Sequence, residues 1–171
     1  IVLGSGSEGI MSTIMRTFLN KGDEIITAKN SFIGFKVLAN ASGKKIHWVP
    51  MKNHRYDLKH MLEFVNKNTK IIYIANPDNP MGTFVEQLEF EKFYSQIPKR
   101  VLIILDEAYF EYSKDSKNYP DSMNYRYDNI ITLRTFSKIY GLAGLRVGYG
   151  FAHSNLIGNI CLLYTSDAAD E

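Results

Sequence analysis

Val101-Leu102-Ile103-Ile104-Leu105-Asp106-Glu107-Ala108-Tyr109 carries the clearest indication of the fold. Its aliphatic residues run without interruption, which is typical of a strand buried on both faces of a sheet. Asp106 follows at once, and a carboxylate at the end of a buried strand needs a cationic partner to stay charged. A protonated ring nitrogen of a bound ligand would serve, and Tyr109 could present its hydroxyl to the same ligand. The alternative is that Asp106 caps the next helix.

Similar short runs recur along the chain, bounded by polar or turn residues. They predict strands over Glu24–Ala28, Lys45–Pro50, Ile71–Ala75, Val101–Leu105 and Ile130–Leu133. Between them, helical spacing of apolar residues predicts helices over Gly9–Asn20, Phe32–Ser42, Leu58–Asn66 and Glu86–Gln96. Strands that alternate with helices predict an α/β fold with a mostly parallel sheet sandwiched by helices. In such sheets ligands bind outside the carboxyl ends of the strands, so the residues that follow the strands are the candidates.

Composition and charge are those of a globular protein and exclude some classes of partner. The chain has 171 residues, 45% hydrophobic and 22% charged, with a formal net charge of +2. So small a charge, carried by scattered basic residues, indicates no nucleic acid partner. No apolar run is long enough to span a bilayer, and Ile1-Val2-Leu3 has no basic leader before it. We therefore expect a cytoplasmic protein with no membrane anchor and no signal peptide. We also expect no metal site.

Both ends of the sequence resemble cut ends. Ile1-Val2-Leu3 has the pattern of the end of a strand, and the residue pattern of Cys161–Glu171 (CLLYTSDAADE) differs from that of the rest of the chain. That last run resembles the translation of a transposase adapter used in sequencing libraries, the alternative being an ordinary helix tail. We expect residues 1–160 to form one partial domain, truncated at both ends, and residues 161–171 to be a non-native tail. Lys114–Tyr127, polar and rich in tyrosine, is expected to be a surface excursion with one short helix.

A glycine-rich segment, Gly4-Ser5-Gly6-Ser7-Glu8-Gly9, matches the pattern G-x-G-x-x-G between an apolar run and a helix. Alone it suggests a dinucleotide site with Asp23 or Glu24 as the ribose-binding acid, or simply a tight glycine turn. The functional interpretations share an anion site, in which the N–H groups of Ser7–Gly9 meet a phosphate at a helix N-terminus.

The loop Asn76-Pro77-Asp78-Asn79-Pro80-Met81-Gly82 follows a predicted strand. Its prolines and glycine favour a rigid conformation, from which the Asn79 amide can donate in a defined direction. A plain turn is the simpler interpretation of this loop taken alone.

Arg134-Thr135-Phe136-Ser137-Lys138 follows the last predicted strand. A lysine in an enclosed, partly apolar setting can release its proton and form a Schiff base with a carbonyl, although a lone lysine after a strand is usually just exposed. Thr135 and Ser137 flank it with hydroxyls that can bond a phosphate. Gly141–Arg146 then returns the chain so that Arg146 can bind a phosphate bidentately.

Taken together, these motifs resemble the class I/II aminotransferases, which are pyridoxal 5'-phosphate enzymes of fold type I. The segments Asp106–Tyr109 and Arg134–Tyr149 are most similar to those of the histidinol-phosphate aminotransferases. The resemblance runs from the first residues to about Ile160, in the family's order and spacing. It implies that residues 1–160 are part of the large cofactor domain of such an enzyme.

The resemblance also implies a role for each matching residue. Lys138 would bind the cofactor and later move the substrate's α-proton, and Asp106 would hold the ring nitrogen protonated. Asn79 and Tyr109 would bond the phenolic oxygen, and Phe32, otherwise a core residue, would stack on the ring. The phosphate would be bound by the following residues: Gly6, Ser7, Glu8, Thr135, Ser137 and Arg146.

The sequence departs from the family pattern at two positions. Met81 stands where the family usually has threonine, and Ser7 where close relatives often carry an acid. The family's N-terminal arm, its smaller C-terminal domain and the arginine that grips the substrate carboxylate have no counterpart in the chain. We therefore expect the chain alone to be poorly soluble and inactive, and its parent to be a homodimer.

Several functions stay open at this point. The first is transfer of an amino group between histidinol phosphate and 2-oxoglutarate, a small-molecule amino donor and a 2-oxo acid, in histidine biosynthesis. An aromatic or aspartate aminotransferase, or a threonine-phosphate decarboxylase, would use the same cofactor residues. A regulatory cofactor-binding domain without turnover would be expected to lack Lys138 or Asp106. A nicotinamide-binding domain would have no use for Lys138 or the Asn79 loop.

Overall fold

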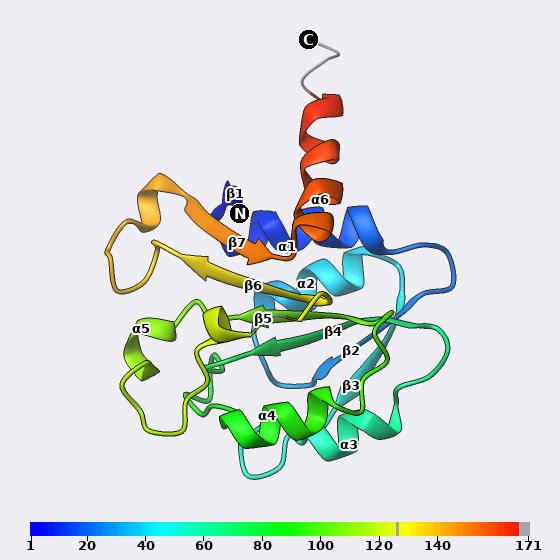
Figure 1. The fold of residues 1–171 in the computed structure, drawn as a ribbon, viewed down its shortest axis with the longest axis vertical. Helices are drawn as coiled ribbons and strands as arrows, with labels where there is room; N and C mark the ends of the chain where they lie inside the picture. The colour runs from blue at the N-terminus through cyan, green and yellow to red at the C-terminus, as the bar shows by residue number, and fades with distance from the viewer. Residues whose placement is uncertain (126, 168–171) are drawn as a thin grey trace.

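The centre of the molecule is a mixed sheet flanked by helices (Figure 1). The computed structural model describes residues 1–125 and 127–167. Within them one seven-stranded sheet has the order β1-β7-β6-β5-β4-β2-β3. Strands β2 to β6 pair in parallel, whereas β7 runs antiparallel to both β6 and β1. The prediction of an α/β fold with a mostly parallel sheet is therefore confirmed. The strand bounds are β1 Val2–Ser5, β2 Glu24–Ala28, β3 Lys45–Val49, β4 Thr69–Ala75, β5 Leu102–Asp106, β6 Ile130–Thr135 and β7 Val147–Ala152.

Helices cover both faces of this sheet. Helices α1 (Gly6–Phe18), α2 (Ile33–Ala41) and α6 (Ser154–Asp167) pack on one face, and α3 (Leu58–Glu63) and α4 (Gln87–Tyr94) on the other (Figure 1). The remaining helical segments are short and lie near the carboxyl ends of the strands: α5 (Phe110–Ser113) and the 3₁₀ turns η1 (Ser122–Asn124) and η2 (Ala143–Leu145).

Strand β5 shows why the sheet needs both layers. Leu102 and Ile104 belong to the core under α1, while Ile103 and Leu105 belong to the core under α4. Side chains alternate between the faces of a strand, so an uninterrupted aliphatic run has to be covered on both sides. Each such side chain, fully buried, contributes roughly 1.5–3 kcal/mol. The predicted burial of this strand on both faces is confirmed.

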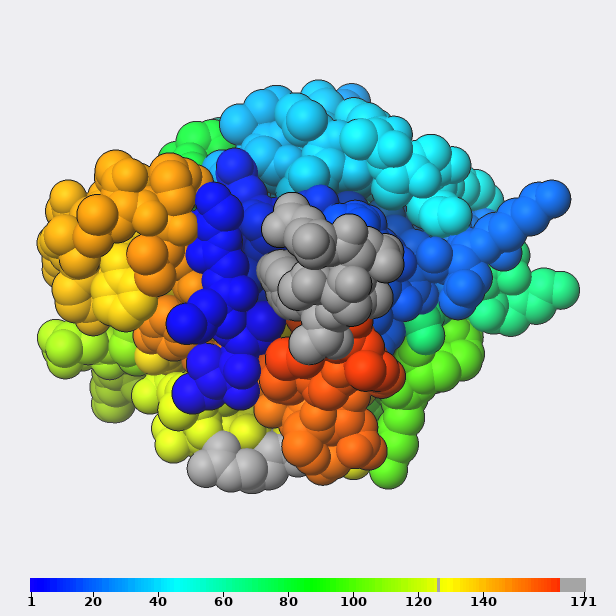
Figure 2. Space-filling view, turned by 90° about the horizontal axis from the view of Figure 1, so that it is seen from above, coloured from blue at the N-terminus to red at the C-terminus, as the bar shows by residue number. Residues whose placement is uncertain are grey.

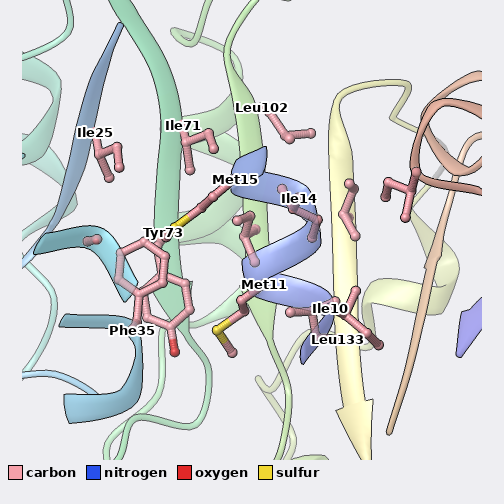
Figure 3. Packing of buried hydrophobic residues seen from close by; sticks show 14 of the residues in the cluster. Ile10, Met11, Ile14, Met15, Ile25, Phe35, Ile71, Tyr73, Leu102 and Leu133 are labelled. Carbon is pink, nitrogen blue, oxygen red and sulfur yellow. The ribbon is translucent and has the colours of Figure 1, made fainter. Parts of the chain in front are cut away.

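Helix α1 fits the sheet through the spacing of its apolar residues. Ile10, Met11, Ile14 and Met15 are buried and face the strands, as Figure 3 shows. This one-sided stripe is the pattern expected of a helix that covers a sheet. The stripe fixes the rotation of α1, and its first turn lies beside Gly148, which pairs with Thr135 at the carboxyl end of β6.

The structure differs from the sequence expectations in three segments. Strand β7 was not predicted, because Gly148 and Gly150 interrupt any apolar run within it. Helix α1 begins at Gly6 rather than at Gly9, so the glycine-rich segment forms its first turn. The excursion 114–127 is anchored rather than merely superficial, because Tyr119 is buried and its hydroxyl donates to the carbonyl oxygen of Asn76.

The run expected to be a non-native tail continues helix α6. That helix extends through residues 161–167, and residues 168–171 lie outside the described part of the chain. In the described ranges no helix is both long and apolar enough to cross a membrane.

Candidate active site

A cavity of about 290 Å³ opens at the carboxyl ends of β4, β5 and β6. The structure brings together at this cavity every residue to which the family resemblance gave a cofactor role. Its lining includes Gly6, Ser7, Glu8, Phe32, Asn79, Asp106, Tyr109, Thr135, Ser137, Lys138 and Arg146. It also includes Ala75, Pro77 and Ala108, which the sequence analysis did not single out. The roles of these residues remain predictions, but their convergence from widely separated segments is a property of the fold.

Asp106 forms the buried end of the cavity. It is the last residue of β5 and pairs in register with Ala75 of β4 and Leu133 of β6. Only 4% of it is exposed, and burial raises the pKa of its carboxyl to about 6. The hydroxyl of Tyr73, the backbone N–H of Ala108 and the charge of Lys138 oppose that rise. At pH 7 the carboxyl is thus mostly ionised and able to bind a cation.

Asn79 and Tyr109 lie on one wall of the cavity. The Asn79 side-chain amide donates to the Tyr109 hydroxyl over 3.4 Å, a long bond that leaves both groups able to serve a ligand. The loop that carries Asn79 is rigid for identifiable reasons. The Asn76 side chain bonds the backbone of Val85 in both directions, and Asp78 accepts from Ser31 and from the N–H of Met81.

Lys138 stands at the mouth of the cavity, across from Asp106. Its Nζ lies 5.2 Å from the centroid of the Tyr109 ring. The enclosed setting expected for this lysine is not what the described chain provides, because Lys138 is exposed. The segment after it is also exposed and apolar, notably Ile139, Leu142 and Leu145. Enclosure of Lys138 therefore requires either a bound ligand or a further surface against this segment.

The first turn of α1 faces the cavity with its backbone. Helix geometry leaves the first N–H groups without helical partners. The N–H of Gly6 is used, since it donates to the carbonyl oxygen of Arg146 at 3.0 Å. The N–H groups of Ser7 and Glu8 therefore remain for an anion, at the positive end of the helix dipole. Gly6 contributes mainly by its size and its φ of 69°, since a Cβ there would lie 2.9 Å from the Arg146 guanidinium.

Hydroxyl and guanidinium groups complete this anion cup. Thr135 Oγ1 lies 3.0 Å from Ser137 Oγ and also accepts from the Ser137 N–H. Arg146 adopts a left-handed backbone conformation with a φ of 52°, which turns the chain back into β7 and brings its side chain beside Gly6. We define the anion cup as Gly6–Glu8, Thr135, Ser137 and Arg146. Its charge and donors suit a phosphate group.

A buried ion pair joins the strands on either side of the cavity. The Arg134 guanidinium contacts Glu107 Oε2 at 2.8 Å and Asp121 Oδ1 at 2.9 Å, and it lies 3.5 Å over the Phe110 ring. Burial raises the pKa of the Glu107 carboxyl, and Arg134 opposes that rise. The ion pair ties the end of β5, next to Asp106, to the strand that leads to Lys138.

The nicotinamide alternative fails on geometry. Asp23 precedes β2 and Glu24 is its first residue, so both lie at the amino ends of the parallel strands, opposite to the cavity. Glu24 is bound there by Lys45, His47 and Asn66, so it cannot serve as a ribose-binding acid beside the glycine-rich turn. As for metals, no group of three or more His, Cys, Asp or Glu residues that could hold an ion occurs in residues 1–125 and 127–167.

Comparison with known proteins agrees with this geometry. The family described as "Aminotransferase class I and II" matches residues 1–163. The chain belongs to the class I and II aminotransferases. Among curated relatives, this aminotransferase chain is 43% identical to histidinol-phosphate aminotransferase 2 of Carboxydothermus hydrogenoformans over 91% of its own length. It is 44% identical to histidinol-phosphate aminotransferase 2 of Hydrogenovibrio crunogenus over 94% of its own length. It spans only 44% and 43% of those relatives.

Solved structures place this aminotransferase chain in the same group. It superposes on histidinol-phosphate aminotransferase from Sinorhizobium meliloti, solved in complex with pyridoxal-5'-phosphate, with a TM-score of 0.80 and 33% identity, covering 88% of this chain and 41% of that one. An aromatic aminotransferase from Pyrococcus horikoshii gives a TM-score of 0.85 at 21% identity, over 98% of this chain and 46% of that one, which shows the shared fold alone. The resemblance inferred from the motifs is confirmed.

Proposed function

We propose that this chain carries the pyridoxal 5'-phosphate site of an aminotransferase that moves an amino group between histidinol phosphate and 2-oxoglutarate. The observation that carries the proposal is the pairing of a buried carboxylate, Asp106, with an exposed lysine, Lys138, across one cavity that also holds an anion cup. A pyridinium nitrogen, an aldehyde and a phosphate ester are the groups that these three features would bind. Pyridoxal phosphate carries all three.

The residues present fit this cofactor. The anion cup offers backbone N–H groups, hydroxyls and Arg146 to the phosphate. Ala75 and Ala108 line the cavity together with Asp106 and Phe32, and their small side chains take little of the room that a ring needs. Asn79 with Tyr109 offers donors to a phenolic oxygen. The departure at Met81 is tolerated in this arrangement, because its backbone N–H is bound by Asp78 and its side chain is not part of the lining.

Each residue then has a defined task. When bound, the pyridine ring supplies an electron sink for the charge that develops at the substrate's α-carbon. Asp106 keeps the proton on the ring nitrogen, which requires its carboxyl to be ionised. Lys138 would take the proton from the substrate's α-carbon and deliver it to the cofactor carbon that carried the aldehyde. Asn79 and Tyr109 orient the ring, and Phe32 excludes water from one of its faces.

The choice of substrate rests on sequence similarity. Identities of 43% and 44% over more than nine tenths of the chain are to proteins named histidinol-phosphate aminotransferase. The likeness to the aromatic aminotransferase concerns the fold alone, and no observation on this chain favours that activity or an aspartate aminotransferase. The presence of both Lys138 and Asp106 argues against a binding domain without turnover.

The family resemblance also suggests a homodimer located in the cytoplasm, and one feature supports the dimer. Exposed apolar side chains of Ile139, Leu142 and Leu145 follow Lys138 at the mouth of the cavity. A second subunit that covered this segment would enclose Lys138 as well. Light scattering on the full-length protein should give twice the subunit mass.

The cofactor is tested by absorbance of the full-length protein mixed with pyridoxal phosphate, followed by borohydride. We expect a visible band that is fixed covalently by reduction, with the modified peptide containing Lys138. Lys138→Ala should lose the fixed label while retaining the fold by circular dichroism. Formation of glutamate from histidinol phosphate and 2-oxoglutarate tests the substrate. A folded wild-type protein that binds no cofactor would refute the proposal, and one that binds it but leaves histidinol phosphate untouched would refute the substrate alone.

A further inference from the structure

Tyr73 is a buried residue of β4 whose position the mechanism above does not use. None of its surface is exposed, and its ring stacks on that of Phe35 with centroids 3.8 Å apart and an angle of 9° between planes. Figure 3 shows the two rings lying one over the other beside α1. This packing fixes the ring of Tyr73, and so it also fixes the place of the hydroxyl.

That hydroxyl is bonded to Asp106. Tyr73 Oη donates to Asp106 Oδ2 at 2.8 Å, while Asp106 Oδ1 accepts from the backbone N–H of Ala108 at 3.2 Å. Each carboxylate oxygen thus has one donor within the protein and keeps acceptor capacity for a ligand. Burial and the charge of Asp106 raise the pKa of Tyr73 well above its ordinary value, so the phenol stays a donor at every working pH.

We propose that Tyr73 is a positioning residue for Asp106, whose fixed hydroxyl sets the rotation of the carboxylate and favours its ionised form. The inference rests on the proposed function, because Asp106 matters in this way only if it binds a protonated ring nitrogen. An ionised carboxylate in a dry position needs donors, and here one of its two donors is a side chain held by aromatic packing. Phenylalanine at position 73 would retain the packing and lose only the donor.

Other charged and titratable groups near Asp106 come from every element around it. Tyr56 and Asp78, both bonded to Ser31, lie on the loops beside β4. The rest line the cavity: Glu8 on α1, Tyr109 after β5, and Lys138 and Arg146 after β6. Lys138 lowers the pKa of Asp106, whereas Glu8 raises it. Replacing Tyr73 leaves all of these groups in place, so their effects cancel when the variant is compared with the wild type.

The test is the affinity for pyridoxamine 5'-phosphate as a function of pH, since this probe has the ring and phosphate but no aldehyde to react with Lys138. Loss of one donor should raise the pKa of Asp106 by about one unit. The ratio of dissociation constants, Tyr73→Phe over wild type, should then be near 1 at about pH 8.5 and rise to roughly tenfold at about pH 5. Tyr94→Phe is the matched control, because its hydroxyl bonds Asn129 instead, and its ratio should be flat.

Two further measurements keep the outcome decisive. In an Asp106→Asn background, Tyr73→Phe should change the affinity by the same factor at every pH. In the wild type, the infrared difference between the protein and Asp106→Asn should show an ionised Asp106 at about pH 8, whether or not Tyr73→Phe folds well. A ratio that does not vary with pH, or a protonated Asp106 at that pH, would overturn the role of Tyr73. A folded wild type that binds no probe at any pH would instead refute the proposed function.

Discussion

Gly148→Ala should weaken the anion cup by displacing the first turn of α1, although Gly148 is not itself a residue of the cup. A Cβ at position 148 would lie 2.5 Å from the carbonyl carbon of Gly6 and 2.7 Å from the N of Ser7. Carbon atoms in contact sit about 3.5–4.0 Å apart, so β7 and the first turn of α1 would have to separate by about 1 Å. Both neighbours are backbone atoms, which cannot move aside by rotation as the end of a side chain does.

The expected cost has two parts. Overpacking of this kind destabilises by roughly 1–3 kcal/mol. A displaced first turn also loses a charge-assisted bond from its N–H groups to the phosphate, worth about 1.5–3 kcal/mol and hence about ten- to a hundredfold in affinity. Fluorescence titration with pyridoxal phosphate measures the second part, and thermal unfolding without cofactor measures the first.

Gly150→Ala is the matched control on the same strand and the same face. Its Cβ would meet side-chain atoms of Leu133, Val2 and Ile10 at 3.1–3.5 Å, which can shift by a few tenths of an ångström. We expect its affinity to stay within about twofold of the wild type, because the first turn of α1 keeps its place. If Gly148→Ala bound the cofactor as tightly as Gly150→Ala does, the close contact between β7 and the first turn would have no bearing on phosphate binding.

Two other predictions concern stability. Hydrogen bonds from Asn66, His47 and Lys45 lower the pKa of Glu24 from 4.5 to about 2, so its stabilising contribution is complete above pH 4.5 and is lost as the pH falls toward 2. Glu24→Gln should reduce this loss of stability at acid pH, measured by urea unfolding at a series of pH values. If the loss is the same in the variant, the acid sensitivity comes from other groups. Arg134→Met removes the partner of buried Glu107 and should cost about 3–5 kcal/mol in the free energy of unfolding at pH 7, whereas a loss below about 1 kcal/mol would mean that water replaces the guanidinium.

The parts of the fold that could be predicted are those whose signal is local. The aliphatic run of β5 and the apolar stripe of α1 are each determined by neighbours within a few residues, so their periodicity is visible in the sequence. The candidate site was predicted for a different reason. Its residues follow strand ends, and parallel strands bring their carboxyl ends together whatever the details of packing.

The parts that could not be predicted depend on distant contacts. Strand β7 is rich in glycine because Gly148 has to approach Gly6, a requirement that only the folded structure reveals. Tyr73 lies in the run Ile71–Ala75, where any large side chain looks like core, and its partner Asp106 is 33 residues away. The exposure of Lys138 could not be predicted either, because enclosing it requires a bound ligand or a second surface against the segment that follows it.

The anion cup also has a consequence for the order in which the protein assembles. It requires β1 to pair with β7, with Val2 opposite Gly150, so it joins the first and last strands in chain order. Figure 2 shows the N-terminal residues, in dark blue, lying against the orange segment that leads into β7. Closing so long a loop costs entropy before any contact is gained, and we expect this pairing to come late. A phosphate ester that binds only the closed cup stabilises it by mass action, by about 2.7 kcal/mol at a hundred times its dissociation constant. The concentration of the phosphate ester would then determine what fraction of newly synthesised chains closes the cup and so resists proteolysis.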